Sequence, residues 1–225
     1  MLLSKLFLLR HLQSRWNEEN RFNGWVDTPL AENQSKTAKA LAKKIFSFKI
    51  DAIYCSRLFR NMDTVARILE HDKKYPIFVH LDAGKMKERG HFKDISQDDI
   101  PVYVSEVLNE RYYGKLQGLN KKEIIKKYGV KKVQQWRRSY QVAPPEGESL
   151  EHVYERTVPF FKKYIEKDLQ QGKNVLVVAS HNALRALIKY IEKISDKDIA
   201  HLEMNYGELR IYNFDKLKSK IAHLN

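Results

Sequence analysis

The chain has 225 residues, 43% of them hydrophobic, which is enough for one sizeable core and predicts a single domain. It carries 41 Lys and Arg against 28 Asp and Glu, a formal net charge of +13 at pH 7, so its partner is expected to be an anion. Its one cysteine, Cys55, excludes an internal disulfide and a structural zinc site built on cysteines, so nothing in the sequence indicates an oxidising compartment.

The N-terminal stretch "MLLSKLFLLRH" contains a short apolar run that Lys5 splits and that Arg10 and His11 follow at once. It has no small-residue cleavage site, so it predicts a strand at about 5–10 rather than a signal peptide. No other run approaches the roughly 20 apolar residues that span a bilayer. We therefore expect a cytoplasmic protein without a membrane partner.

Apolar runs of strand length alternate with segments of helical period along the rest of the chain. Further strands are predicted at about 51–55, 76–80, 174–180 and 208–214. Helices are predicted at about 32–47, 57–71, 121–128, 131–139, 148–170 and 182–194. This alternation is typical of an α/β fold in which a mainly parallel central sheet has helices on both faces.

Two segments do not follow this alternation. The segment at about 82–107 is polar and weakly periodic, and we interpret it as an insertion or excursion beside the sheet within one domain that spans 1–225. The basic C-terminal stretch "DKLKSKIAHLN", 215–225, is either a lid over a site or a frayed tail.

Ligands of such folds bind at the carboxyl ends of the strands, so the polar residues there are candidates for a site. Three strand ends present Arg10 and His11; Ser56, Arg57 and Arg60; and Ser180, His181, Asn182 and Arg185. Like charges gathered at one sheet edge repel one another unless an anion neutralises them. Two histidines with several arginines at that edge therefore indicate an anion site.

These residue types suit a phosphoryl group. A neutral imidazole can attack phosphorus at pH 7, and guanidinium groups offer forked donors to the phosphoryl oxygens. This chemistry requires no metal, and the lack of a G-x-x-x-x-G-K-[ST] sequence argues against a nucleotide-binding loop. The charge excess is also compatible with solvated helix faces or with nucleic acid. We favour a small phosphorylated substrate and no nucleic-acid partner.

Three blocks of the sequence resemble a known family. The block "LLRHLQSRWNEENRFNGWVD", 8–27, is similar to R-H-G-E-S-x-W-N-x-x-N-x-F-T-G-W-x-D, and "LNERYYGKLQGLNKKE", 108–123, is similar to L-N-E-R-H-Y-G-x-L-Q-G-L-N-K. The third block is "WRRSY", 136–140, with "GESL", 147–150. These are signatures of the 2,3-bisphosphoglycerate-dependent phosphoglycerate mutases of the histidine phosphatase superfamily. The second block is the specific one, and the resemblance covers nearly the whole chain.

The resemblance implies a phosphoglycerate mutase-like fold and the interconversion of 3-phosphoglycerate and 2-phosphoglycerate through a phosphohistidine on His11. It also implies 2,3-bisphosphoglycerate as primer, no metal, and a homodimer or homotetramer. Arg10 and Arg60 would hold the phosphoryl oxygens, and Glu110 would be the general acid and base, which near neutrality requires enclosure to raise its pKa. The other positions that match substrate-holding residues are Asn17, Asn23, Gly24, Arg111, Tyr113, Lys121, Arg137, Arg138 and Asn182.

The chain also departs from the family pattern. Leu12 stands where the family has glycine, and its side chain would crowd the phosphate or tilt His11 if the backbone must approach the ligand closely or adopt a positive φ. Where the family reads A-H-G-N-S-L-R, this chain reads "ASHNALR". Without a gap Ser180 falls on the second catalytic histidine, and with one residue deleted His181 does. We favour the ungapped register for the backbone and still expect His181 to supply the imidazole.

Two other functions stay open. The first is a phosphomonoesterase of the histidine phosphatase type, in which water accepts the phosphoryl group and inorganic phosphate is released. The second is a degenerate, non-catalytic relative that binds phosphorylated ligands, which Leu12 and Ser180 motivate. Failure to incorporate phosphate on His11 would favour this second alternative.

Overall fold

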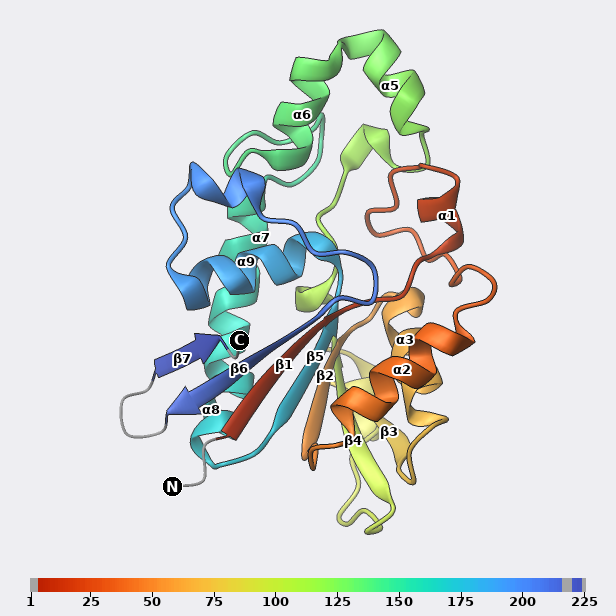
Figure 1. The fold of residues 1–225 in the computed structure, drawn as a ribbon, viewed down its shortest axis with the longest axis vertical. Helices are drawn as coiled ribbons and strands as arrows, with labels where there is room; N and C mark the ends of the chain where they lie inside the picture. Colours follow the sequence, from red (N-terminus) through yellow and green to blue (C-terminus); the bar gives the residue numbers. More distant parts are fainter. Residues whose placement is uncertain (1–3, 216–219, 224–225) are drawn as a thin grey trace.

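The structure, a computed structural model, describes residues 4–215 and 220–223. Its centre is a 7-stranded sheet in the order β3-β4-β2-β5-β1-β6-β7 (Figure 1). The strands from β3 to β1 run parallel, whereas β6 pairs antiparallel with β1 and β7 pairs antiparallel with β6. The predicted α/β class is confirmed. The bounds are β1 Ser4–Arg10, β2 Ala52–Ser56, β3 Tyr75–His80, β4 Asp99–Ser105, β5 Val175–Ala179, β6 Leu209–Asp215 and β7 Lys220–His223.

Helices cover both faces of the sheet because successive residues of a strand point to opposite sides. Leu6 and Leu8 of β1 belong to the core cluster that α7 and α9 complete. Phe7 and Leu9 belong to the cluster that α2 and α3 complete. Figure 1 shows these two pairs of helices on either side of the sheet.

The helices lie close to their predicted positions. Their bounds are α1 Arg15–Glu18, α2 Ser35–Ile45, α3 Phe59–Leu69, α4 Lys85–Arg89, α5 Lys121–Tyr128, α6 Val130–Arg138, α7 Leu150–Phe160, α8 Glu166–Gln170 and α9 His181–Glu192, with short turns η1 Glu106–Leu108, η2 Gly114–Leu116 and η4 Asp198–His201. The predicted helix at 148–170 is divided, because a π-helical turn, η3 Phe161–Ile165, separates α7 from α8. Pro159, which has no N–H to donate, lies just before this turn. Within the described residues, no helix has the length and the apolar character that crossing a bilayer requires.

Strand β4 corrects the interpretation of 82–107 as an excursion. Asp99–Ser105 lies inside the sheet between β3 and β2, and Val102 and Val104 are fully buried. Pro101 concealed this strand in the sequence, because proline is rare inside sheets and argues against a central strand. The rest of the segment lies outside the sheet: the residues between β3 and β4, which include α4, and the first residues of η1.

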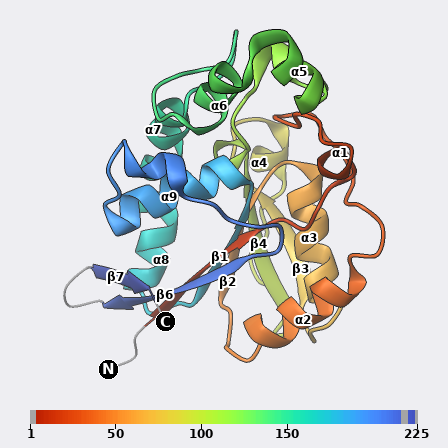
Figure 2. The same ribbon diagram turned by 45° about the horizontal axis from the view of Figure 1, so that its top comes forward.

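A small layer stands over the carboxyl ends of the parallel strands. It consists of α5, α6 and the turn η2, as Figures 1 and 2 show. These elements pack around a cluster of their own, which is separate from the two main clusters. Its buried members are Phe22, Leu116, Ile124, Val133 and Trp136. The layer and the sheet edge together enclose the site.

The C-terminal stretch does not form a lid in the part that the structure describes. Lys220–His223 is strand β7, which pairs with the last residues of β6, and those residues of β6 pair with the first residues of β1. This register places β7 at the end of the sheet opposite Arg10 and His11. Positions 216–219 and 224–225 of this stretch, for which the sequence leaves both a lid and a frayed tail open, lie outside the described residues.

Candidate active site

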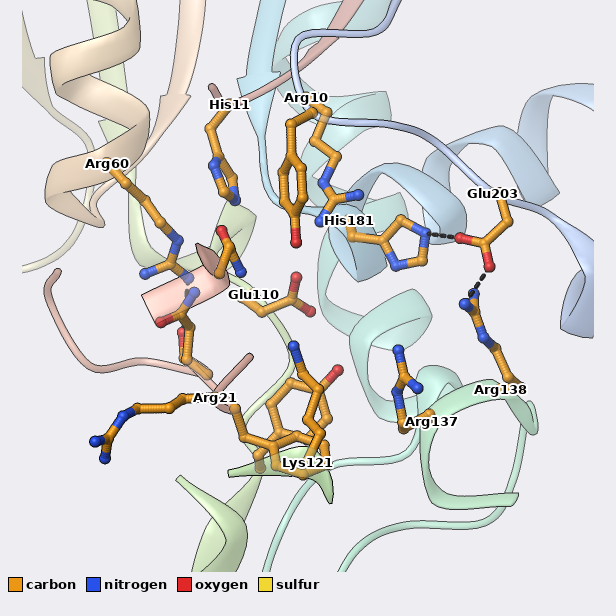
Figure 3. A pocket seen from close by; sticks show the side chains of 16 residues that line it. Arg10, His11, Arg21, Arg60, Glu110, Lys121, Arg137, Arg138, His181 and Glu203 are labelled. Atoms are coloured by element: carbon orange, nitrogen blue, oxygen red, sulfur yellow. Dashed lines mark hydrogen bonds and ion pairs between the residues drawn. The ribbon is translucent and has the colours of Figure 1, made fainter. Parts of the chain in front are cut away.

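A cavity of about 210 Å³ lies between the carboxyl end of β1 and the layer of α5 and α6 (Figure 3). Among its lining residues are most of the predicted ones: Arg10, His11, Asn17, Asn23, Gly24, Arg60, Glu110, Tyr113, Lys121, Arg137, Arg138 and His181. Arg111 and Asn182 do not line it. Four lining residues were not predicted: Arg21, Phe22, Glu203 and Tyr206.

His11 directly follows β1, and its ring extends into the cavity (Figure 3). Its Nδ1 lies 2.6 Å from the carbonyl oxygen of Leu12. A carbonyl can only accept, so Nδ1 carries the proton and Nε2 keeps its lone pair. Burial, followed by the charges of Arg60 and Arg10, lowers the pKa of His11 well below 6.5. The imidazole is therefore neutral at pH 7 and able to act as a nucleophile.

Arg60, in the first turn of α3, is fully buried beside His11. Its guanidinium donates to the carbonyl oxygens of Val26 at 3.0 Å and Gly24 at 2.8 Å. Gly24 has φ +53°, in the left-handed region that favours glycine, so glycine suits the backbone conformation that presents this carbonyl. The loop after α1 thus fixes the guanidinium in place.

Arg10 is held from the opposite side. Its guanidinium donates to the carbonyl oxygen of Met204 and lies 3.8 Å from the centre of the Tyr206 ring. Within the described residues, the Nε atoms of both Arg10 and Arg60 are buried without a hydrogen-bond partner. Buried donors of this kind are costly unless a ligand satisfies them, so both arginines are suited to hold an anion.

Cations also form the wall opposite His11. Lys121 begins α5 and Arg137 lies in the last turn of α6, and Figure 3 shows both side chains directed into the cavity. Burial, followed by the charges of Arg137 and Arg10, lowers the pKa of Lys121 to about 8. An anion between these groups would relieve their mutual repulsion.

Glu110 is fixed by three donors. Its Oε1 accepts from the Asn182 side chain at 2.6 Å and from the Arg111 backbone N–H at 2.7 Å, and its Oε2 accepts from the Asn182 backbone N–H at 3.3 Å. Arg111 and Asn182 therefore contact the carboxylate from behind, which corrects their placement as cavity residues. Figure 3 shows the Glu110 carboxylate facing the space between His11 and Lys121.

The pKa of Glu110 also corrects the prediction. Burial alone would raise it, but the nearby His181 and the hydrogen bonds from Asn182 and Arg111 outweigh burial and bring the pKa below its usual value. Without a ligand Glu110 is therefore ionised at neutral pH. It is ready to accept a proton.

Leu12 does not crowd the cavity. Its side chain is 1% exposed and packs into the core between the sheet and α2. We expect Leu12→Ala to lower the free energy of unfolding by about 2–5 kcal/mol, because the truncation leaves a void in the core. Activity should stay close to wild type, since the truncated atoms face away from His11. Urea unfolding and steady-state kinetics measure the two effects, and a large loss of activity with unchanged stability would contradict this placement.

The second histidine lies at the junction of β5 and α9. β5 ends at Ala179, Ser180 is the N-cap of α9, and His181 is the first helical residue. Ser180 is fully buried and accepts from the Asn61 side chain at 3.2 Å, outside the cavity. The His181 side chain lines the cavity, as predicted. Burial lowers its pKa to about 4 despite the neighbouring Glu203 carboxylate.

Two of the four unpredicted residues, Glu203 and Tyr206, come from the loop between η4 and β6. Because β6 runs antiparallel to β1, its preceding loop lies beside the carboxyl end of β1. The sequence predicts a strand at 208–214 but not its direction. If the strand at 208–214 had been assigned as antiparallel to the first strand, the loop before it would have been predicted to lie beside the site.

The two buried histidines should make stability depend on pH. Both pKa values are lower in the folded protein than the usual 6.5, so the unfolded chain takes up protons first as pH falls. We expect the free energy of unfolding to be highest above pH 6.5 and to fall below it by up to about 1.4 kcal/mol per pH unit for each histidine. Urea unfolding between pH 7 and 5 measures the slope. His181→Gln should make the slope shallower, and an unchanged slope would contradict the assignment.

A sequence model described as the histidine phosphatase superfamily (branch 1) matches residues 6–86 and 91–225. A Methanococcus vannielii protein named 2,3-bisphosphoglycerate-dependent phosphoglycerate mutase is 44% identical over 226 residues, covering 99% of this chain and 96% of the relative. Proteins of the same name from Methanosarcina mazei and Chlamydia pneumoniae are 42% and 43% identical, covering 95% and 96% of this chain and 91% and 96% of those relatives.

Solved structures share the fold. Mycobacterial hydrolase 1 superposes with a TM-score of 0.77 at 21% identity, covering 99% of this chain and 97% of that one. Bacillus stearothermophilus YhfR superposes with a TM-score of 0.76 at 22% identity, covering 98% and 95%. The whole described chain therefore adopts a fold already known from experiment.

Proposed function

Because this chain belongs to the histidine phosphatase superfamily, we propose that it is a 2,3-bisphosphoglycerate-dependent phosphoglycerate mutase, which interconverts 3-phosphoglycerate and 2-phosphoglycerate. The observation that carries the proposal is the arrangement in one basic cavity of a neutral His11, two arginines whose Nε atoms have no hydrogen-bond partner among the described residues, and the Glu110 carboxylate. The mutase name of relatives 42–44% identical over nearly the full length supports the choice of reaction. The many cations of the cavity fit the several negative charges of bisphosphoglycerate.

In the priming step Nε2 of His11 attacks one phosphorus of bisphosphoglycerate, and the bond from that phosphorus to the glycerate oxygen breaks. Arg10 and Arg60 neutralise the charge on the transferred oxygens. Glu110 gives a proton to the departing oxygen. It can hold that proton because the negative charges of a bound substrate raise its pKa above the value in the empty cavity.

In the productive step the free hydroxyl of a bound monophosphoglycerate loses its proton to Glu110 and attacks the phosphorus of phospho-His11. The bond from phosphorus to Nε2 breaks, and bisphosphoglycerate forms. His11 then takes the other phosphoryl group, so the monophosphoglycerate that leaves carries its phosphate on the other oxygen. Arg111 and Asn182 keep Glu110 in place throughout.

The cations opposite His11 would bind the groups that do not react. Lys121, Arg137 and Arg138 supply charge for the carboxylate and the second phosphate. Asn17, Asn23, Gly24 and Tyr113 line the same space and can orient the glycerate. The Asn23 side chain donates to Ser14 at 3.0 Å and Ser14 donates to Asn17 at 2.7 Å. A chain of hydrogen bonds therefore links the two asparagines on this side of the cavity.

Product analysis tests the proposal. The protein should convert 3-phosphoglycerate to 2-phosphoglycerate in a reaction that depends on bisphosphoglycerate, and acid-labile, base-stable phosphate should appear on His11. Release of inorganic phosphate equal to the substrate consumed, without the isomeric product, would indicate a phosphomonoesterase instead. A protein that binds bisphosphoglycerate but incorporates no phosphate would be the non-catalytic relative.

We also propose a homodimer or homotetramer. β3 is at the open edge of the sheet, and exposed apolar side chains gather on it and on the segment that follows it. These are Tyr75, Phe78, Met86, Phe92 and Ile95. Exposed apolar groups next to an open strand edge favour association. Light scattering gives the mass in solution, and a monomer at micromolar concentration would reject this part of the proposal.

A further inference from the structure

Besides Glu110, the carboxylate of Glu203 lines the basic cavity. Glu203, in the loop after η4, places Oε2 3.2 Å from Nε2 of His181, and its Oε1 forms an ion pair with Arg138 (Figure 3). A carboxylate at the rim of an anion site repels the ligand. Because this repulsion opposes ligand binding, we expect Glu203 to have a role that offsets it.

The loop that carries Glu203 is fixed to the nucleophile strand. The carbonyl oxygen of Met204 accepts from the Arg10 side chain, and the backbone N–H of Gly207 lies 3.2 Å from the carbonyl oxygen of Arg10 and 3.3 Å from that of His11. Arg138 holds the other end of the Glu203 side chain to α6. Although half exposed, the carboxylate is therefore placed by contacts on two sides.

The contact with Glu203 determines which ring nitrogen of His181 carries the proton. A neutral imidazole has one N–H, and a carboxylate can only accept, so Glu203 favours the proton on Nε2. Figure 3 shows Nδ1 on the other edge of the ring, on the side of Glu110 and Arg137. Within the described residues neither ring nitrogen of His181 makes an aligned hydrogen bond, so Glu203 acts on the nearby Nε2 through its charge. Nδ1 lies on the edge of the ring away from Glu203 and is free to meet a ligand.

We propose that Glu203 is a positioning residue for His181, which it orients so that Nδ1, rather than Nε2, donates to the phosphoryl group. The inference rests on the proposed function. When a phosphoryl anion binds, His181 takes up one proton from solvent at Nδ1 and donates it in a hydrogen bond to a phosphoryl oxygen. Glu203 then faces an imidazolium, which it stabilises more strongly than the neutral ring. The proton stays on His181 while phosphorus moves between His11 and the substrate oxygen.

The charges around His181 explain why this protonation depends on the ligand. Arg10 and Arg185 oppose a positive charge on the ring, whereas Glu110 and Glu203 favour it, and the neutral His11 adds no charge. Arg138 contacts the far oxygen of Glu203 and weakens its effect. Burial outweighs the two carboxylates in the empty cavity, so the ring is neutral at pH 7. A bound phosphoryl dianion adds the charge that reverses this balance.

Nitrogen NMR of His181, with inorganic phosphate as the ligand, tests the orientation without any turnover. In the free protein we expect the neutral ring to carry its proton on Nε2, and phosphate to raise the pKa of His181. Glu203→Gln should keep the tautomer, since an amide oxygen also accepts, but should lower the pKa in the phosphate-bound protein by about one pH unit. Glu203→Ala should lose the preference for the proton on Nε2 and should also lower the pKa of His181 in the phosphate-bound protein. Glu208→Gln, in the same loop but bonded to Asn205 and Arg210, is the matched control and should resemble wild type.

Kinetics give the second readout. Glu203→Gln should lower kcat by about tenfold, with a smaller change in KM, because the half-exposed contact is partly screened. The alkaline limb of the rate profile, which reports loss of the proton from His181, should move to lower pH, and the melting temperature should stay unchanged. A wild-type ring with its neutral proton on Nδ1, or a Glu203→Gln protein with the titration and kcat of wild type, would overturn the inference. If His11 incorporates no phosphate in any variant, the proposed function fails, and the NMR result still decides the role of Glu203.

Discussion

Replacing His11 by alanine is expected to abolish phosphate incorporation from bisphosphoglycerate and to lower mutase turnover on the order of 10⁴-fold or more. The reason is geometric as well as chemical. Nδ1 of His11 is occupied by the Leu12 carbonyl, so Nε2 is the atom that faces the two arginines with an available lone pair. Radiolabelled bisphosphoglycerate, followed by acid and base treatment of the denatured protein, measures the incorporation.

Binding should persist in the same variant. Arg10 and Arg60 keep their contacts to backbone carbonyls when the imidazole is removed, so calorimetry should still detect inorganic phosphate in His11→Ala. The matched control is His71→Ala, which removes an exposed imidazole far from the cavity and should react as wild type does. Phosphate that stays bound covalently in His11→Ala would identify another acceptor, such as His181 in the same cavity, and would overturn the assignment of the nucleophile.

The parts of the site that lie at the ends of parallel strands follow from the sequence. A short apolar run followed by charged residues locates both the strand and the side chains it presents, as β1 does for Arg10 and His11. Parallel strands bring their carboxyl ends to one edge, so Arg60 and His181 fall beside them without further information. The resemblance adds Glu110, Lys121 and their neighbours, which belong to segments that no strand pattern would place at this edge.

Other features depend on interactions that a local pattern does not contain. β4 was missed because Pro101 and its acidic neighbours weigh against a strand, yet pairing with β2 on one side and β3 on the other stabilises it. The direction of β6, and with it the position of Glu203, is decided by pairing between distant segments. The pKa of Glu110 depends on how many donors reach the carboxylate. Burial alone would predict a raised pKa for Glu110, whereas its pKa is lowered.

Glu110→Gln is expected to lower mutase turnover by about 10³-fold, because an amide can neither take the hydroxyl proton nor give one to the departing oxygen. The substitution keeps an oxygen that can accept from Asn182 and from the Arg111 backbone. The fold should therefore survive, and the melting temperature checks this. Glu18→Gln, which neutralises an exposed carboxylate in α1, is the matched control.

A phosphoryl donor whose leaving group needs no proton distinguishes proton transfer by Glu110 from a positioning role of Glu110. Acetyl phosphate can phosphorylate His11 with acetate as the departing group, and acetate is a stable anion that needs no proton. In Glu110→Gln the rate of His11 phosphorylation should therefore fall sharply with bisphosphoglycerate and only slightly with acetyl phosphate, since His11, Arg10 and Arg60 are intact in both reactions. Rapid quench with each donor measures these rates. An equal loss with both donors would mean that Glu110 holds the nucleophile or the phosphoryl group in place, and that the proton moves through another residue of the cavity.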